Sequence, residues 1–226
     1  MTTRLTLSDP ELVAVTLQPR RVLHGRTDLE SLDFRVYLGA PLVTRLSADV
    51  LDHAAAEFLR TEEPQAAYYL LNLIINCYPT YDAPLVAADV GVLLTHDGPA
   101  DIPAPVAWSM TPNELITPVT GSTTVDLTAN LGFVKAGVTH TIENAQERFL
   151  LGLGEGQSNP EWQFRATSSQ HEIVGIHRLS VIVRAPSDVR CQAGIIVAAT
   201  VRKRRAGLIR YRAQLPTSLA SVRFPP

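Results

Sequence analysis

Histidine and serine side chains gather in residues 168–177, and these are the groups best suited to acid–base or nucleophilic chemistry. His171 and His177 flank a hairpin-like loop that also holds Ser168, Ser169 and Glu172. A hydrolase of the Ser-His type needs an acid that orients the histidine, and a metal site needs three or four converging ligands. The loop supplies neither set. We therefore expect two surface histidines at strand ends, no metal ion and no cofactor, with a hydrolase built on this loop as an alternative.

A basic run near the C-terminus is the most concentrated charge in the chain. It falls between two predicted strands, with Ala206 and Gly207 as the turn, so a solvated hairpin tip is the simplest interpretation. Guanidinium groups would also suit an acidic partner. The candidate partner-binding residues are Arg202, Lys203, Arg204, Arg205, Arg210 and Arg212.

The two tryptophans suggest a third kind of site, a glycan-binding or glycan-cleaving surface. Trp162 is in phase with Phe164 and Ala166, so we expect it to be buried. Trp108 lies in a proline-rich setting and is the candidate for stacking on a ligand. Glycan cleavage would need a pair of carboxylates, and no pair stands out in the sequence.

Other motifs are absent or incomplete. The nucleophile motif G-x-S-x-G does not occur, and the glycines at 152, 154 and 156 lack the G-x-G-x-x-G spacing and a following helix. Cys77 and Cys191 are too few for a disulfide framework or a zinc site. We expect both to be free, buried thiols.

Composition narrows the classes of function and location. The 226 residues carry a formal net charge of −2, which argues against a nucleic-acid-binding protein held by bulk charge. The first residues lack the apolar region of a signal peptide, and the longest apolar run, residues 66–75, is about half of what a membrane span needs. We expect a cytoplasmic protein without a membrane span.

The elements that would position these residues are mostly strands. Residues 161–167, 177–186 and 208–215 alternate between apolar and polar side chains, as half-buried strands do. Residues 193–201 are apolar on both faces, which predicts a central strand covered on both sides.

The N-terminal part contains both strand-like and helix-like patterns. Residues 11–17 and 32–38 alternate, with Phe34 expected to face inward and Arg35 outward. The spacing of apolar residues predicts a helix over residues 47–62, with Ser47 as its N-cap and Pro64 beyond its end. Residues 67–78 are compatible with either a strand or a helix.

The middle of the chain predicts short strands separated by proline and glycine turns. They cover residues 85–96, 106–110, 114–119, 123–133, 138–143 and 149–153. Alternation within 123–143 also occurs in hairpins that insert into membranes. A strand of a soluble sandwich has the same pattern, which is the interpretation we adopt.

These patterns predict an all-β fold, an antiparallel β-sandwich with one accessory helix near residues 47–62. We expect a single domain over residues 1–226, with an opening segment 1–64, a core 65–215 and a tail 216–226 that docks on its own domain or on a neighbour. Because no catalytic set converges, the favoured function is a non-enzymatic binding or assembly module that recognises a protein partner or its own copies. A glycan ligand and the hydrolase remain the alternatives.

Overall fold

Antiparallel strands make up most of the residues that the computed structural model describes, which are 11–20, 31–78, 82–116, 148–168, 170–203 and 207–225. The elements are β1 (Leu12–Pro19), β2 (Leu32–Gly39), β3 (Leu42–Arg45), η1 (Ala48–Val50), α1 (His53–Glu62), β4 (Ala66–Cys77), β5 (Leu85–His96), β6 (Val106–Thr111), β7 (Glu114–Leu115), β8 (Leu150–Leu153), β9 (Glu161–Arg165), β10 (Gly175–Pro186), β11 (Cys191–Lys203), β12 (Gly207–Gln214), α2 (Thr217–Ala220) and β13 (Ser221–Arg223). The strands predicted at 123–133 and 138–143 lie outside the described residues.

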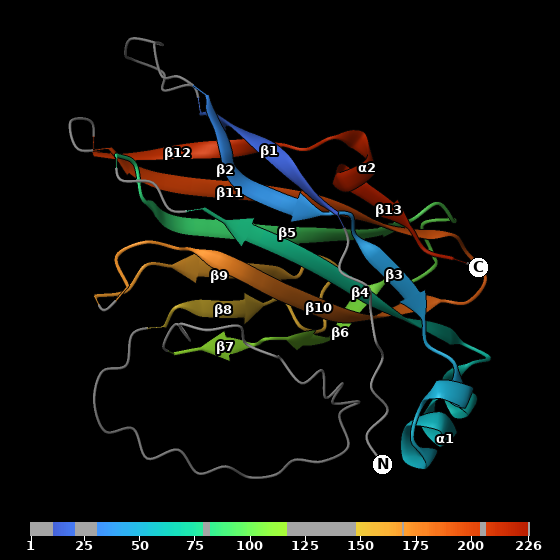
Figure 1. Cartoon of the computed structure of the whole chain (residues 1–226). Helices are drawn as coiled ribbons and strands as arrows, with labels where there is room; N and C mark the ends of the chain where they lie inside the picture. The colour runs from blue at the N-terminus through green and yellow to red at the C-terminus, as the bar shows by residue number, and fades with distance from the viewer. Residues whose placement is uncertain are drawn as a thin grey trace.

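Hydrogen bonds link the strands of the described residues into one curled sheet of 13 strands (Figure 1). The main path runs β6-β10-β4-β2-β1-β12-β11-β5-β9-β8-β7, with β3 paired to β4 and β13 paired to β11. The predicted antiparallel all-β class is confirmed. The sandwich form is not, because the pairing runs through β2, β1 and β12 from one wall of the sheet to the other instead of separating two sheets.

The core lies between the two walls of the curled sheet. Leu71, Leu73 and Ile75 of β4 belong to the same buried cluster as Val90 of β5 and Val197 of β11. Trp162 of β9 is fully buried in this cluster, as the alternation predicts, and its Nε1 donates a hydrogen bond to the Pro112 carbonyl at 3.1 Å. The apolar faces of both walls are thereby removed from water.

β4 is covered on both faces along almost its whole length, and the prediction that residues 193–201 form such a strand is wrong. Every residue of β4 except Asn72 is buried, because the main core lies on one side and a smaller cluster with Leu46, Ala55 and Leu59 lies on the other. This also settles residues 67–78 as a strand. β11 alternates, with Val197 buried and Ile196 49% exposed, because nothing in the described chain covers its outer face.

The predicted facing of residues 34 and 35 is also wrong. A bulge interrupts the pairing of β1 with β2, since Val15 pairs with Val36 whereas Leu17 pairs with Leu32. Phe34 takes a positive φ of 57° and is 66% exposed, and Arg35 turns inward and is buried. A bulge of this kind changes the direction of a side chain without changing the strand's composition.

The predicted helix begins later than expected. Asp52, not Ser47, is the N-cap of α1, and its side chain accepts a hydrogen bond from the Ala55 amide at 2.9 Å. Residues 48–50 form only the short turn η1, without a side-chain cap from Ser47. The helix lies at one end of the sheet (Figure 1).

The C-terminal tail docks on its own chain. α2 leads into β13, which pairs with β11, and the Phe224 ring lies 4.8 Å from the Tyr69 ring. None of the helices in the described part of the chain is long and apolar enough to cross a membrane.

Candidate functional site at the basic end of the sheet

Three segments far apart in the sequence meet in a half-open cavity of about 450 Å³. Arg148 precedes β8, residues 166–171 follow β9, and Arg202 is close to the end of β11. The side chains that line the cavity are Arg148, Ala166, Thr167, Ser168, His171 and Arg202. The sequence-predicted loop and the sequence-predicted basic run therefore contribute to one site.

The start of β5 holds two of these segments together. The Ala166 amide donates to the Val86 carbonyl at 2.9 Å, and the Ile173 amide donates to the Leu85 carbonyl at 2.7 Å. The Arg202 amide donates to the Pro84 carbonyl at 3.0 Å. We call residues 83–86 the anchor segment, because its carbonyl groups fix both the 166–173 segment and the end of β11.

Arg35 supports the anchor segment from inside the fold. Its guanidinium donates to the Ala83 carbonyl at 2.8 Å, and its Nε has no hydrogen-bond partner among the described residues. Burial lowers the pKa of Arg35, and the neighbouring Glu172 carboxylate partly opposes that effect. The inward turn of Arg35 at the β2 bulge thus places a buried positive charge beside the segment that holds Arg202.

The cavity walls are themselves ordered by local contacts. The Arg148 Nε lies 2.5 Å from the Glu114 carboxylate, and both side chains are largely exposed. The Thr167 amide donates to the Gln170 carbonyl at 2.8 Å, and the Gln170 amide donates to the Thr167 hydroxyl at 3.1 Å. This turn leaves Ser168 exposed at the rim.

The basic residues of the hairpin share one face of the sheet. Arg202 pairs with Leu208 across β11 and β12, and Ala198 pairs with Arg212. We call the exposed side of β11 and β12 the outer face; its exposed residues are Gln192, Ile196, Arg202, Leu208, Arg210, Arg212 and Gln214. Lys203 is half-buried, and Arg204 and Arg205 lie outside the described residues.

Asp89 of β5 organises part of this face. Its two carboxylate oxygens lie 2.6 Å from Arg165 and 3.1 Å from Arg210. The Asp89 side chain is only 16% exposed. Arg210 is therefore engaged within the chain, whereas Arg202 and Arg212 form no ion pair within the described residues.

The two histidines of the loop do not converge. His171 is exposed and lines the cavity. His177 packs between the rings of Phe149 and Phe164 at 5.6 and 4.9 Å, and its Nε2 lies 3.2 Å from the Val174 carbonyl. Burial lowers the pKa of His177.

A metal or hydrolase centre lacks support in the described part of the chain. No group of three or more His, Cys, Asp or Glu side chains there could hold a metal ion. Ser168 and His171 share the cavity, but the described lining contains no carboxylate to orient the histidine, and Ser169 lies outside the described residues. Cys77 and Cys191 are free and buried.

Trp108 is half-buried at the opposite end, beside α1. Its ring meets Tyr68 edge-on, with centroids 5.7 Å apart, and lies 5.9 Å from the Phe58 ring. Part of its stacking surface is therefore already covered by the protein. Trp108 does not approach the basic residues, so the two sequence-predicted sites are separate, and stacking of a glycan on Trp108 stays a prediction.

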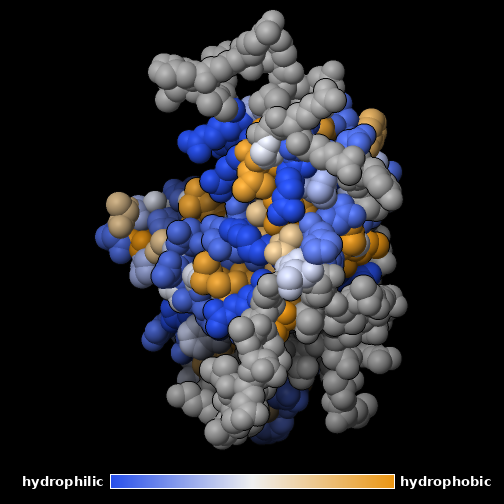
Figure 2. All heavy atoms as spheres, turned by 90° about the vertical axis from the view of Figure 1, so that its left-hand side faces the viewer, coloured by the Kyte–Doolittle hydropathy of each residue, from blue (hydrophilic) through white to orange (hydrophobic). Residues whose placement is uncertain are grey.

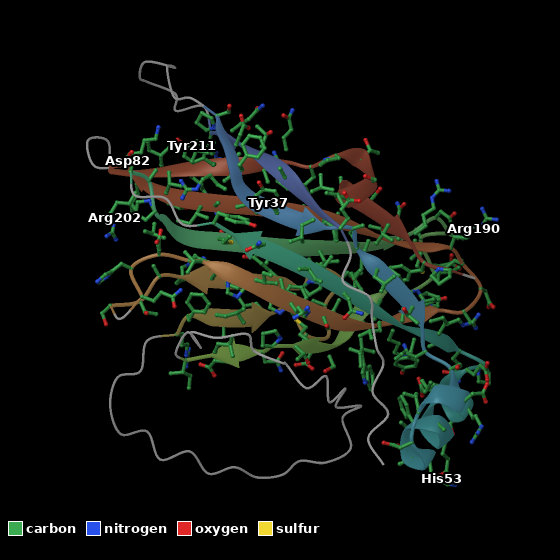
Figure 3. All side chains as sticks on the ribbon, in the orientation of Figure 1. Tyr37, His53, Asp82, Arg190, Arg202 and Tyr211 are labelled. Carbon is green, nitrogen blue, oxygen red and sulfur yellow. The ribbon has the colours of Figure 1, made fainter. Side chains whose placement is uncertain are left out.

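Arg202, one of the lining residues, lies at one end of the molecule (Figure 3). Arg202 lies at the end where Asp82 lies, away from Arg190 and from His53 of α1 (Figure 3). Seen from that end, hydrophilic side chains alternate with hydrophobic ones (Figure 2). Sequence reasoning missed Arg148 and Arg35, because neither lies in a charge run or a motif.

Comparison with known proteins assigns no family. No family model matches the chain, and no curated protein matches it. Among solved structures, the crystal structure of the Clostridium perfringens NetB toxin in the membrane inserted form aligns over 94% of each chain, at 10% identity and a TM-score of 0.32. A similarity this weak carries no argument about the fold or the function of this chain.

Proposed function

We propose that the chain is a non-enzymatic β-sandwich binding or assembly module that recognises a protein partner, or its own copies, through the outer face. In this proposal the wall of β6, β10 and β4 and the wall of β11, β5, β9 and β8 serve as the two layers of the sandwich.

The observation that carries the proposal is the mixture of apolar and guanidinium side chains on the outer face. Leu208 is 66% exposed opposite Arg202, and Ile196, 49% exposed, lies on the same side of β11 as Arg202. Exposed apolar side chains that lie among guanidinium groups suit a protein interface, and arginine is enriched at protein–protein interfaces. A partner that presents both acidic and apolar side chains fits this face.

Its own copies could supply such an acidic surface. The exposed side chains in and around α1 include Asp49, Asp52, Glu57 and Glu63, with Arg60 as the exposed arginine among them. α1 lies at the opposite end of the molecule from Arg202 (Figure 3). Contact between unlike surfaces of two copies would be a head-to-tail interface.

A poly-glutamate peptide carrying a fluorescent dye tests recognition of an acidic partner. We expect saturable binding that weakens as salt rises, and at least tenfold weaker binding by Arg212→Gln. Arg190→Gln is the matched control, since Arg190 is also exposed but lies at the other end. Equal loss in both variants would contradict the assignment to the outer face.

Sedimentation velocity of the chain alone tests the alternative of self-recognition. Head-to-tail contact predicts association that grows with protein concentration and is lost in Glu57→Gln as well as in Arg212→Gln. A strict monomer that also fails to bind poly-glutamate would overturn the proposed function.

A second candidate, the hydrolase, draws on the placement of Ser168 and His171 at one cavity. It predicts a hydrolytic activity that disappears in both Ser168→Ala and His171→Ala with the fold intact. If activity survives in either variant, this candidate fails, because a serine hydrolase needs its nucleophile and its base together.

A further inference from the structure

Donor groups dominate the cavity at the basic end. Two guanidinium groups, an imidazole and two hydroxyl groups line it, and the described lining includes no carboxylate. Two acids adjoin the lining: Glu114 pairs with Arg148, and Glu172 follows His171 in the chain. An array of this kind suits an anion that accepts several hydrogen bonds, and arginine matches the geometry of phosphate-type oxyanions.

Backbone contacts order the segments that carry the lining residues. Thr167, one of the lining residues, is buried with only 8% of its surface exposed. The anchor segment fixes both the 166–173 segment and the Arg202 backbone, and Glu114 holds the Arg148 side chain. A segment whose backbone is already ordered loses less entropy on binding.

Arg35 adds charge behind the cavity. It is buried to all but 6%, and it bonds to Ala83, next to the Pro84 carbonyl that accepts from Arg202. A charge shielded from water acts over a longer distance than an exposed one. Arg35 therefore adds a buried positive charge behind the cavity, which the neighbouring Glu172 carboxylate partly offsets.

We propose that this cavity binds the oxyanion group of a small monoester, with phosphate preferred over sulfate because phosphate carries the larger charge near neutral pH. Its volume of about 450 Å³ leaves room for an organic group beside the oxyanion. The inference goes beyond the proposed function, with which it shares Arg202 alone.

Phenyl phosphate and phenyl sulfate are suitable probes for isothermal titration of the full chain. We expect saturable binding of phenyl phosphate and weaker binding of phenyl sulfate. Arg148→Gln and His171→Gln should each weaken phenyl phosphate binding about tenfold. Arg190→Gln, at the other end of the molecule, should stay within about twofold of the original affinity.

Vesicles of phosphatidylcholine with and without phosphatidic acid distinguish the source of the oxyanion. Binding to phosphatidic acid vesicles that phenyl phosphate displaces would place the group on a lipid, and binding of the free monoester alone would place it on a soluble ligand; both support the site. Absence of saturable phenyl phosphate binding, or unchanged affinity in Arg148→Gln and His171→Gln, overturns it.

The experiments distinguish a failure of the cavity proposal from a failure of the proposed function of the outer face. Far-ultraviolet circular dichroism checks that each variant is folded, and both test residues are exposed, so substitution leaves the core intact. Loss of poly-glutamate binding in Arg212→Gln with phenyl phosphate binding retained would leave the cavity site standing. The reverse pattern would remove the cavity site and keep the proposed function.

Discussion

At the residue scale, His177 links the stability of the fold to pH. Its ring is enclosed by Phe149 and Phe164, and burial lowers its pKa in the folded state. The unfolded chain therefore takes up the proton first, at a pKa of about 6.5, so this contribution to stability is complete above that pH and decreases as the pH falls below it.

We expect the free energy of unfolding to decrease by up to about 1.4 kcal/mol per pH unit just below pH 6.5 because of this group. His177→Phe, which keeps an aromatic ring in the same place, should remove that part of the slope in urea unfolding curves. An identical pH profile for the variant and the original chain would show that His177 titrates alike in both states.

The two thiols give a second prediction at this scale. Burial raises the pKa of Cys77 to about 12 and that of Cys191 to about 11. Because the thiolate is the reactive form, both cysteines should resist maleimide in the folded protein and react once urea unfolds it. Rapid labelling without denaturant would mean that the strand ends carrying them open readily.

At the element scale, Trp162 fixes β9 against the turn between β6 and β7. Trp162→Phe removes the hydrogen bond to the Pro112 carbonyl and leaves a small void, so we expect a loss of about 1–3 kcal/mol in stability. Trp108→Phe is the control, since Trp108 is half-buried in the smaller cluster and should cost less. Equal losses would argue that β9 is not anchored through its tryptophan.

Asp89 joins β5 to the neighbouring β9 through Arg165 and, across β11, to β12 through Arg210. Asp89→Asn should destabilise the protein by about 1 kcal/mol at low salt and by less at high salt, because both arginine side chains are substantially exposed. Asp101→Asn, an exposed acid elsewhere, should change stability little. Combining Asp89→Asn with Arg210→Gln should cost less than the sum of the two if they act as one network.

At the scale of the whole molecule, the alternation of apolar and polar side chains predicted the strands and the all-β class. It did not predict that the strands form one curled sheet. Alternation located β9 and β12 closely, because these strands are covered on one side. It also located β10, although residues 179–183 of that strand are buried on both faces. Alternation was a poor guide to β11, because the residues on its outer face are small or apolar and were predicted to be buried. It could not decide between strand and helix for β4, because the segments that cover its two faces are distant in the sequence.

The candidate site was predictable only in part, for a similar reason. The basic run and the histidine loop were evident as charge and chemistry, and the structure brings Arg202 and His171 to one cavity. Arg148 reaches the cavity because β8, which follows it in the chain, pairs with β9. Arg35 reaches the anchor segment because a bulge in β2 turns its side chain inward. Both depend on long-range pairing that local sequence does not encode.

The proposed function depends on the outer face being the surface that binds a partner. Because Cys77 and Cys191 are buried, a single dye can be attached through Ile196→Cys at the middle of that face, and through Ser187→Cys as a control near the other end. Addition of poly-glutamate, or of excess unlabelled chain, should change the emission of the dye at 196 and not at 187. A response at 187 alone, or equal responses at both, would contradict the account.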